Sequence, residues 1–162
     1  MNPLVVEAMK KAALAWLTVG EQPAYAVWCL WVDGALYLVS GADEQPTPGL
    51  DGAGTALVSA RGDHGGRVVT WPAAVERVEP DSELWTSVVP QLAGKRLNST
   101  GAEDLAARWA SSSVVWRLVS AGDPAEAGDS LPDGSLAEPP PPTPARTSAH
   151  RPFRLHKVRG AR

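Results

Sequence analysis

The chain of 162 residues is long enough for one compact domain and a tail, and its 44% hydrophobic residues can build a core. A single cysteine excludes an internal disulfide and any metal site built from several cysteines. No apolar run approaches the roughly 18 to 20 residues of a membrane span, and the first residues lack the order of a signal peptide. The net charge of −3 divides into −4 over residues 1–120, −5 over 121–144 and +6 over 145–162, so the body is mildly acidic. These features predict a cytoplasmic protein.

The first predicted elements are a helix and a short strand. Asn2 can cap a helix that begins at Pro3, because proline is favoured at the first helical position. Apolar residues then recur at helical spacing as far as residue 12. A strand at 14–19 and a turn at 20–23 follow.

The strongest local signal is a hairpin over residues 24–41, where two apolar, aromatic-rich runs flank Asp33-Gly34. A two-residue turn would place Val32 opposite Ala35 and, further along the pair, Trp28 opposite Val39. Neither run has polar residues at every second position, which is the pattern of a strand with one solvated face. Both faces of the hairpin are therefore predicted to be covered, by a closing barrel, a helix or another subunit.

Three further strands and two helices are predicted downstream. A polar segment at 42–54 precedes strands at 55–60 and 67–78, joined by a glycine turn. Pro72 removes a ladder donor, so the second of these strands should lie at a sheet edge or be bulged there. Asp81 or Ser82 begins a helix. The inward face of this helix is expected to be Leu84, Trp85, Val88, Val89 and Leu92. A short helix at 102–110 and a sixth strand at 114–119 complete the body.

The composition changes after Ser120. Residues 121–149 are rich in Gly, Ala, Pro and acidic residues, with four prolines at 139–142, and are predicted to be a disordered linker. Residues 150–162 form a basic segment expected to dock on the acidic body as a strand or to remain solvated. Nucleic-acid binding by this segment is the less favoured alternative. The chain thus divides into 1–120, 121–149 and 150–162.

Three stretches carry a family resemblance: ALYLVSG at 35–41, RVVTWPAAVERV at 67–78 and DSELW at 81–85. With the order of elements, they resemble the pyridoxamine 5′-phosphate oxidase-like split-barrel proteins over about residues 5–120. The resemblance implies a mainly β (α+β) fold, a six-stranded antiparallel split β-barrel with a few short helices, which forms a homodimer. It also implies FMN, or the deazaflavin F420, in a groove at the dimer interface.

The resemblance further implies where the cofactor would lie. The ring system would follow the hairpin strands, and the phosphate would lie near the end of the second strand. Flavin-binding members place a basic pair just beyond that strand, but this chain has Glu44, Gln45 and Pro46 there. A phosphate prefers Arg or Lys donors or a helix N-terminus, and Glu44 would repel it. The candidate cofactor-binding residues are Tyr25, Val27, Trp28, Cys29, Ser40, Gly41, Gln45, Arg61, Arg67, Lys95 and Arg96.

No catalytic residue is assigned from the sequence. Hydrolase motifs are absent, and His64, the one histidine of the predicted body, has no second histidine or cysteine at metal-ligand spacing. Cys29 fits a small buried hydrophobe better than a reactive thiol. Two functions stay open for this small-molecule-binding protein. One is an FMN- or F420-dependent oxidoreductase that transfers hydride to a small molecule. The other is a non-catalytic ligand-binding or interaction protein that has lost the phosphate site.

Overall fold

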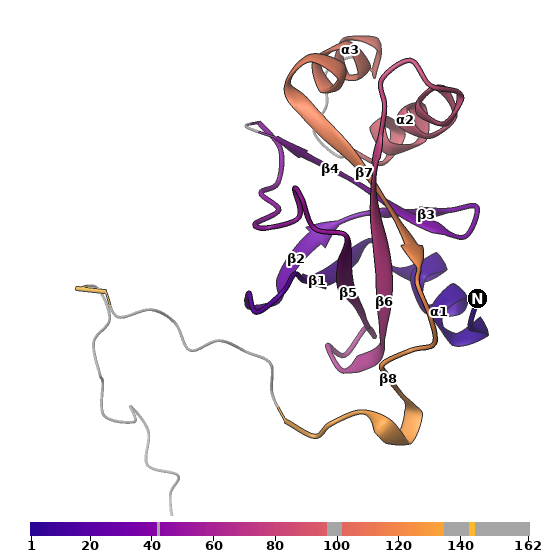
Figure 1. The fold of residues 1–162 in the computed structure, drawn as a ribbon, viewed down its shortest axis with the longest axis vertical. Coiled ribbons are helices and arrows are strands. Elements are labelled where there is room, and N and C mark those ends of the chain that lie inside the picture. The colour runs from indigo at the N-terminus through magenta and orange to yellow at the C-terminus, as the bar shows by residue number, and fades with distance from the viewer. Residues whose placement is uncertain (42, 97–101, 135–142, 145–162) are drawn as a thin grey trace, which may run out of the picture.

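A computed structural model describes residues 1–41, 43–96, 102–134 and 143–144 (Figure 1). The sheet contains β1 (Leu14–Thr18), β2 (Tyr25–Trp28), β3 (Leu30–Val32), β4 (Ala35–Gly41), β5 (Thr55–Arg61), β6 (Arg67–Val78), β7 (Ser113–Ser120) and β8 (Glu126–Ala127). The helices are α1 (Pro3–Lys11), α2 (Glu83–Lys95), α3 (Ala102–Ser112) and the 3-10 turn η1 (Gly128–Ser130). No helix among the described residues is both long and apolar enough to cross a membrane.

The sheet curls into a split barrel. Its strand order is β2-β1-β5-β6-β7-β4-β3, all pairs are antiparallel, and β8 adds to β6. The two outer strands of this order, β2 and β3, follow each other in the sequence with only Cys29 between them. One residue spans a few ångströms, so the two edges of the sheet must approach each other. The predicted fold class, a mainly β antiparallel split barrel with short helices, is therefore confirmed.

The predicted hairpin is correct near its turn and wrong at its far end. Val32 lies opposite Ala35, and the next two pairs follow in the predicted register. The predicted pairing of Trp28 with Val39 is wrong. Trp28 belongs to β2, which pairs with β1 and not with β4, and it lies opposite Leu14. The change of partner occurs at Cys29, whose N–H donates to the Ala13 carbonyl at 3.1 Å. This break, together with β8, turns six predicted strands into eight.

Pro72 lies in an internal strand, so the predicted edge position is wrong. It faces Leu57 of β5, and the bulge of this strand pair falls at Ala60/Arg61. On its other side, β7 pairs only from Ala73 onward and β8 only as far as Thr70. The Pro72 position therefore faces the gap between these two strands, where no ladder partner needs a donor.

The helices cover two separate cores. Val5 and Met9 of α1 are buried in the barrel interior. Helices α2 and α3 lie together at one end of the molecule (Figure 1) and cover the outer face of β4 and β7. All of β4 from Ala35 to Ser40 is buried, as expected for a strand with two covered faces. The predicted inward face of α2 is correct except for Leu84, which is 37% exposed, while Ala93 is buried.

Candidate functional site

An open groove of about 890 Å³ lies between the end of α1, the link from β2 to β3, and the end of α2. Its larger apolar and aromatic lining comes from Met9, Leu14, Trp28, Cys29, Leu30 and Trp31. Its charged lining consists of four cations, Lys10, Lys11, Lys95 and Arg96, which we call the four-cation cluster. Among the residues that the structure describes, no acidic side chain lines the groove. It therefore combines flat apolar surfaces with a net positive charge.

Trp28 is the aromatic side chain that connects this groove to the helical end of the molecule. Its ring centroid lies 6.5 Å from that of Trp109, and the Arg96 guanidinium carbon lies 5.3 Å from the Trp28 ring centroid. The Trp28 Nε1 atom is buried and has no hydrogen-bond partner among the described residues. A buried donor without an acceptor costs about 1–3 kcal/mol.

Glu44 fixes Arg96 beside Trp28. The Glu44 side chain is only 1% exposed, and its Oε2 lies 2.7 Å from Nη1 of Arg96. Its Oε1 accepts a hydrogen bond of 2.8 Å from Nε1 of Trp109. The carboxylate that the sequence places where flavin-binding members have a basic residue is thus neutralised inside the protein.

Gln45 joins two strands that do not pair with each other. Its Nε2 donates to the carbonyls of Trp28 at 3.0 Å and Val39 at 3.1 Å, and its Oε1 accepts from the Trp28 N–H at 2.8 Å. Both amide N–H groups are used in these bonds, so Gln45 has no donor left for a ligand. We call this junction of β2 and β4 the seam.

The other residues predicted to border a cofactor ring divide between the groove and the core. Cys29 lines the groove, but it is buried, and burial raises the pKa of its thiol to about 12, so the thiol is neutral at physiological pH. Val27 is buried in the barrel core. The Tyr25 hydroxyl donates to the Pro48 carbonyl at 3.1 Å, and burial raises its pKa to about 12. Among these ring candidates, Trp28 and Cys29 are the two that lie in the groove.

Ser40 and Gly41 line a different hollow of about 390 Å³ at the exit of β4. The Ser40 Oγ accepts from Nε1 of Trp116 at 2.8 Å. A Cβ on Gly41 would lie 2.7 Å from the Ser113 Oγ, so glycine permits the close approach of the α3–β7 junction. The cation in this hollow, Arg77, is paired with Asp51 at 2.9 Å. The place where the resemblance implies a phosphate therefore has no net positive charge.

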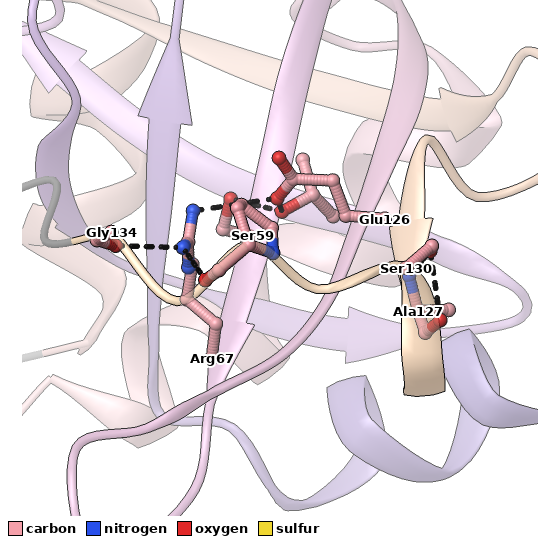
Figure 2. Close-up of polar contacts among 8 residues, drawn as sticks. Ser59, Arg67, Glu126, Ala127, Ser130 and Gly134 are labelled. Carbon is pink, nitrogen blue, oxygen red and sulfur yellow. Dashed lines mark hydrogen bonds and ion pairs between the residues drawn. The ribbon is translucent and has the colours of Figure 1, made fainter.

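Arg61 and Arg67 lie away from both hollows. Arg61 stacks on Trp16 with 3.9 Å between its guanidinium carbon and the ring centroid. Arg67 is 10% exposed and ion-pairs with Glu126 at 3.5 Å. Its Nη2 donates to the carbonyls of Pro132 and Gly134 at 2.6 and 2.9 Å (Figure 2).

The Arg67 contacts form a clasp that holds the chain after β7 on the sheet. The Glu126 carboxylate also accepts from the Thr70 hydroxyl at 3.0 Å, and that hydroxyl bonds Ser59 at 2.8 Å (Figure 2). Glu126 and Ala127 therefore pair with β6, and Gly128–Ser130 form η1, within the segment 121–149 that the sequence predicts to be a disordered linker. The basic segment 150–162 lies outside the described residues. The division of the chain into three parts stays a prediction.

Replacing Arg67 by methionine should release this clasp. The change leaves Glu126 and two carbonyls without their charged donor, and we expect a loss of about 1–2 kcal/mol in the free energy of unfolding. Amide exchange in residues 126–134 should become faster while β4 keeps its protection. Arg77→Met is the matched control, because its ion pair with Asp51 is exposed and worth little. Unchanged exchange at 126–134 in the Arg67 variant would contradict the clasp.

The structure brings four of the predicted site residues together: Trp28, Cys29, Lys95 and Arg96 line one groove. Sequence reasoning missed Lys10 and Lys11, which also line this groove. Their position in the last turn of the first helix, directly before a strand that pairs with the hairpin, was the available signal. Among the described residues, no cluster of three or more His, Cys, Asp or Glu side chains could hold a metal ion.

Comparison with known proteins gives structural likeness without sequence matches. No protein-family model and no curated protein matches this sequence. A candidate pyridoxamine 5′-phosphate oxidase from Listeria innocua aligns with a TM-score of 0.52 and 15% identity, covering 73% of this chain and 91% of that one. The heme storage protein HutZ from Vibrio cholerae aligns with a TM-score of 0.55 and 15% identity, covering 76% and 92%.

A third similar structure is a candidate 5-nitroimidazole antibiotic resistance protein from Bacteroides thetaiotaomicron. It aligns with a TM-score of 0.53 and 14% identity, covering 75% of this chain and 81% of that one. At such identities the likeness concerns the fold. The curled antiparallel sheet, the helix before it and the helices between β6 and β7 together give this chain the fold of the pyridoxamine 5′-phosphate oxidase-like split-barrel proteins.

Proposed function

We propose that the chain binds a planar, anionic cofactor of the flavin class, FMN or F420, in the groove beside Trp28. The observation that carries this proposal is the groove itself, which places Trp28 and Trp31 next to four cations, with no acid among the described lining residues. Aromatic faces favour stacking on a flat conjugated ring, and cations favour an acidic group on the same ligand. The resemblance to the pyridoxamine 5′-phosphate oxidase-like proteins implies this ligand class, and the chain shares the fold of a candidate pyridoxamine 5′-phosphate oxidase.

The residues of the chain would bind and orient such a cofactor. Trp28 and Trp31 would contact the ring, and Arg96 would face its acidic part. A bound flavin or deazaflavin supplies hydride transfer, which would make the protein an oxidoreductase acting on a small molecule. The proposal includes the homodimer implied by the resemblance, which sedimentation of the purified chain can measure.

The second candidate is a non-catalytic relative that has lost the phosphate site at the exit of β4. The observation that favours it is the use of Glu44 and Gln45 in internal bonds, at the places where flavin-binding members have a basic pair. Such a protein would hold another planar ligand or act through its surface. The likeness to a heme storage protein adds heme to the ligands that a test should include.

Titrating the full chain with FMN, F420 and hemin, while tryptophan fluorescence is recorded, separates these functions. The proposal predicts quenching by FMN or F420 with micromolar affinity. Trp28→Phe should reduce the amplitude, while Trp16→Phe, outside the groove, should not. Reduction of the bound cofactor by a chemical donor and its reoxidation by a small-molecule acceptor would support the oxidoreductase. Quenching by hemin alone, or by none of the three, would reject the flavin proposal.

A further inference from the structure

We propose that the acidic group of the ligand is held by the four-cation cluster, and that this cluster has taken over the role of a phosphate site at the exit of β4. This inference rests on the proposed function and names where the anion of that ligand would bind. Two places in the fold can be compared as binding sites for this anion. One is the groove at Lys10, Lys11, Lys95 and Arg96, and the other is the hollow at Ser40 and Gly41.

The balance of charge favours the groove. Its four cations have two carboxylate partners among the described residues, Glu7 on Lys10 and Glu44 on Arg96. The Lys10–Glu7 pair is 3.3 Å long, and its side chains are 58% and 62% exposed, so solvent screens it strongly. The hollow at the β4 exit contains one cation and one carboxylate, already paired. A phosphate therefore finds a net positive charge in the groove and none in the hollow.

The geometry of Arg96 prepares it for an anion. Its guanidinium has five N–H donors in a rigid plane, and Glu44 engages one end of that plane through Nη1. The Trp28 ring lies 5.3 Å from the guanidinium carbon and limits its movement further. The side chain remains 28% exposed at the groove. Glu44 thus acts as a positioning residue that orients Arg96 toward the ligand, although the carboxylate also offsets part of the positive charge of Arg96.

The lysines also have a structural explanation that must be weighed. Cations in the last turn of a helix offset the negative end of its dipole, and Lys10 and Lys11 occupy that place in α1. The same explanation applies at the end of α2, where Lys95 lies in the last turn and Arg96 is the C-cap. It gives no reason for these two helix ends to line the same groove. The convergence of two helix ends on one aromatic groove is what points to a ligand anion.

Riboflavin and FMN form a matched pair for the test, because they share the ring system and differ by one phosphate. We expect the full chain to bind FMN at least tenfold more tightly than riboflavin at low salt. In Lys10→Gln/Lys11→Gln/Lys95→Gln this preference should fall by about tenfold, with riboflavin affinity unchanged. The three lysines are exposed, so the variant should fold, which circular dichroism would verify. F420 and its deazaflavin core without the phosphodiester tail provide the same comparison for the second cofactor.

Arg77→Gln is the control at the other place, since it removes the cation of the hollow at the β4 exit. It should keep the phosphate preference. Loss of the preference in Arg77→Gln but not in the lysine variant would overturn the inference and return the anion to the β4 exit. Equal affinity of the wild-type chain for both members of each pair would overturn it as well, while leaving ring binding intact. Absence of binding by all four ligands would instead reject the proposed function.

Discussion

Glu44→Ala is expected to destabilise the protein by about 3 kcal/mol, because it removes the acceptor of the buried Trp109 indole N–H and the counter-ion of the partly exposed Arg96. The carboxylate is 1% exposed and pairs with Arg96 at 2.7 Å. It also accepts the indole N–H of Trp109, a residue that is itself 0% exposed. Alanine leaves the guanidinium without its counter-ion and the indole without its acceptor. Denaturation of the full chain by urea, followed by circular dichroism, measures the loss.

Two companion variants separate the parts of this effect. Glu44→Gln keeps an oxygen for the Trp109 N–H and removes only the charge, so we expect about half of the loss. Glu79→Ala removes an exposed carboxylate next to α2 and should change stability by less than about 0.5 kcal/mol. A loss below about 1 kcal/mol in Glu44→Ala would show that water can replace the carboxylate, contrary to the expectation.

Gln45→Ala should cost about 2–3 kcal/mol, since it deletes three hydrogen bonds to part-buried main-chain groups. The N–H and carbonyl of Trp28 and the carbonyl of Val39 would lose their partner at the seam, where no strand ladder can replace it. Amide exchange should become faster at Trp28 before the rest of the barrel is affected. The same variant should weaken the proposed flavin binding, because Trp28 is anchored by this side chain.

Gln91→Ala is the matched control for this prediction. Gln91 also donates through Nε2 to a carbonyl, that of Ser87 at 3.0 Å, but the bond is exposed and single. Its loss should change the free energy of unfolding by less than about 0.5 kcal/mol. Gln45→Glu keeps the acceptor for the Trp28 N–H and loses both donors, so it should resemble the alanine variant. Equal stability of the Gln45 and Gln91 variants would refute the role of the seam.

The sequence predicted most of the fold because local signals specify it. Asp33-Gly34 set the turn and register of β3 and β4, and Ser82 set the start of α2 through its bond to the Trp85 N–H at 3.0 Å. The break at Cys29 has no local signal, since residues 24–32 are apolar throughout. Which of two neighbours a uniformly apolar strand pairs with depends on the curl of the whole sheet. Tertiary structure therefore determines the pairing partner of β2.

The site was harder to predict because a cation does not reveal its counter-ion in the sequence. In the sequence, nothing distinguishes Arg67 from Arg96 as a candidate cation. In the fold, Arg67 pairs with Glu126 of β8, whereas Arg96 pairs with Glu44 beside the groove. From the sequence alone, Glu44 is expected to repel a phosphate. Its ion pair with Arg96, which offsets that charge, is visible only in the structure. The role of Trp28 at the groove could be predicted, because the family resemblance already implies that a cofactor ring lies along that strand.

The one-residue link between β2 and β3 also bears on self-association. A sheet with exposed edges can recruit a strand from another molecule, and proteins limit this with short or covered edges. Here the two edge strands have four and three residues, and they end at the same point of the barrel. The free edge of β2 is held at the seam, where Gln45 bonds the N–H and the carbonyl of Trp28. Gln45 thus occupies main-chain groups of an edge strand that would otherwise be open to a strand of a second molecule.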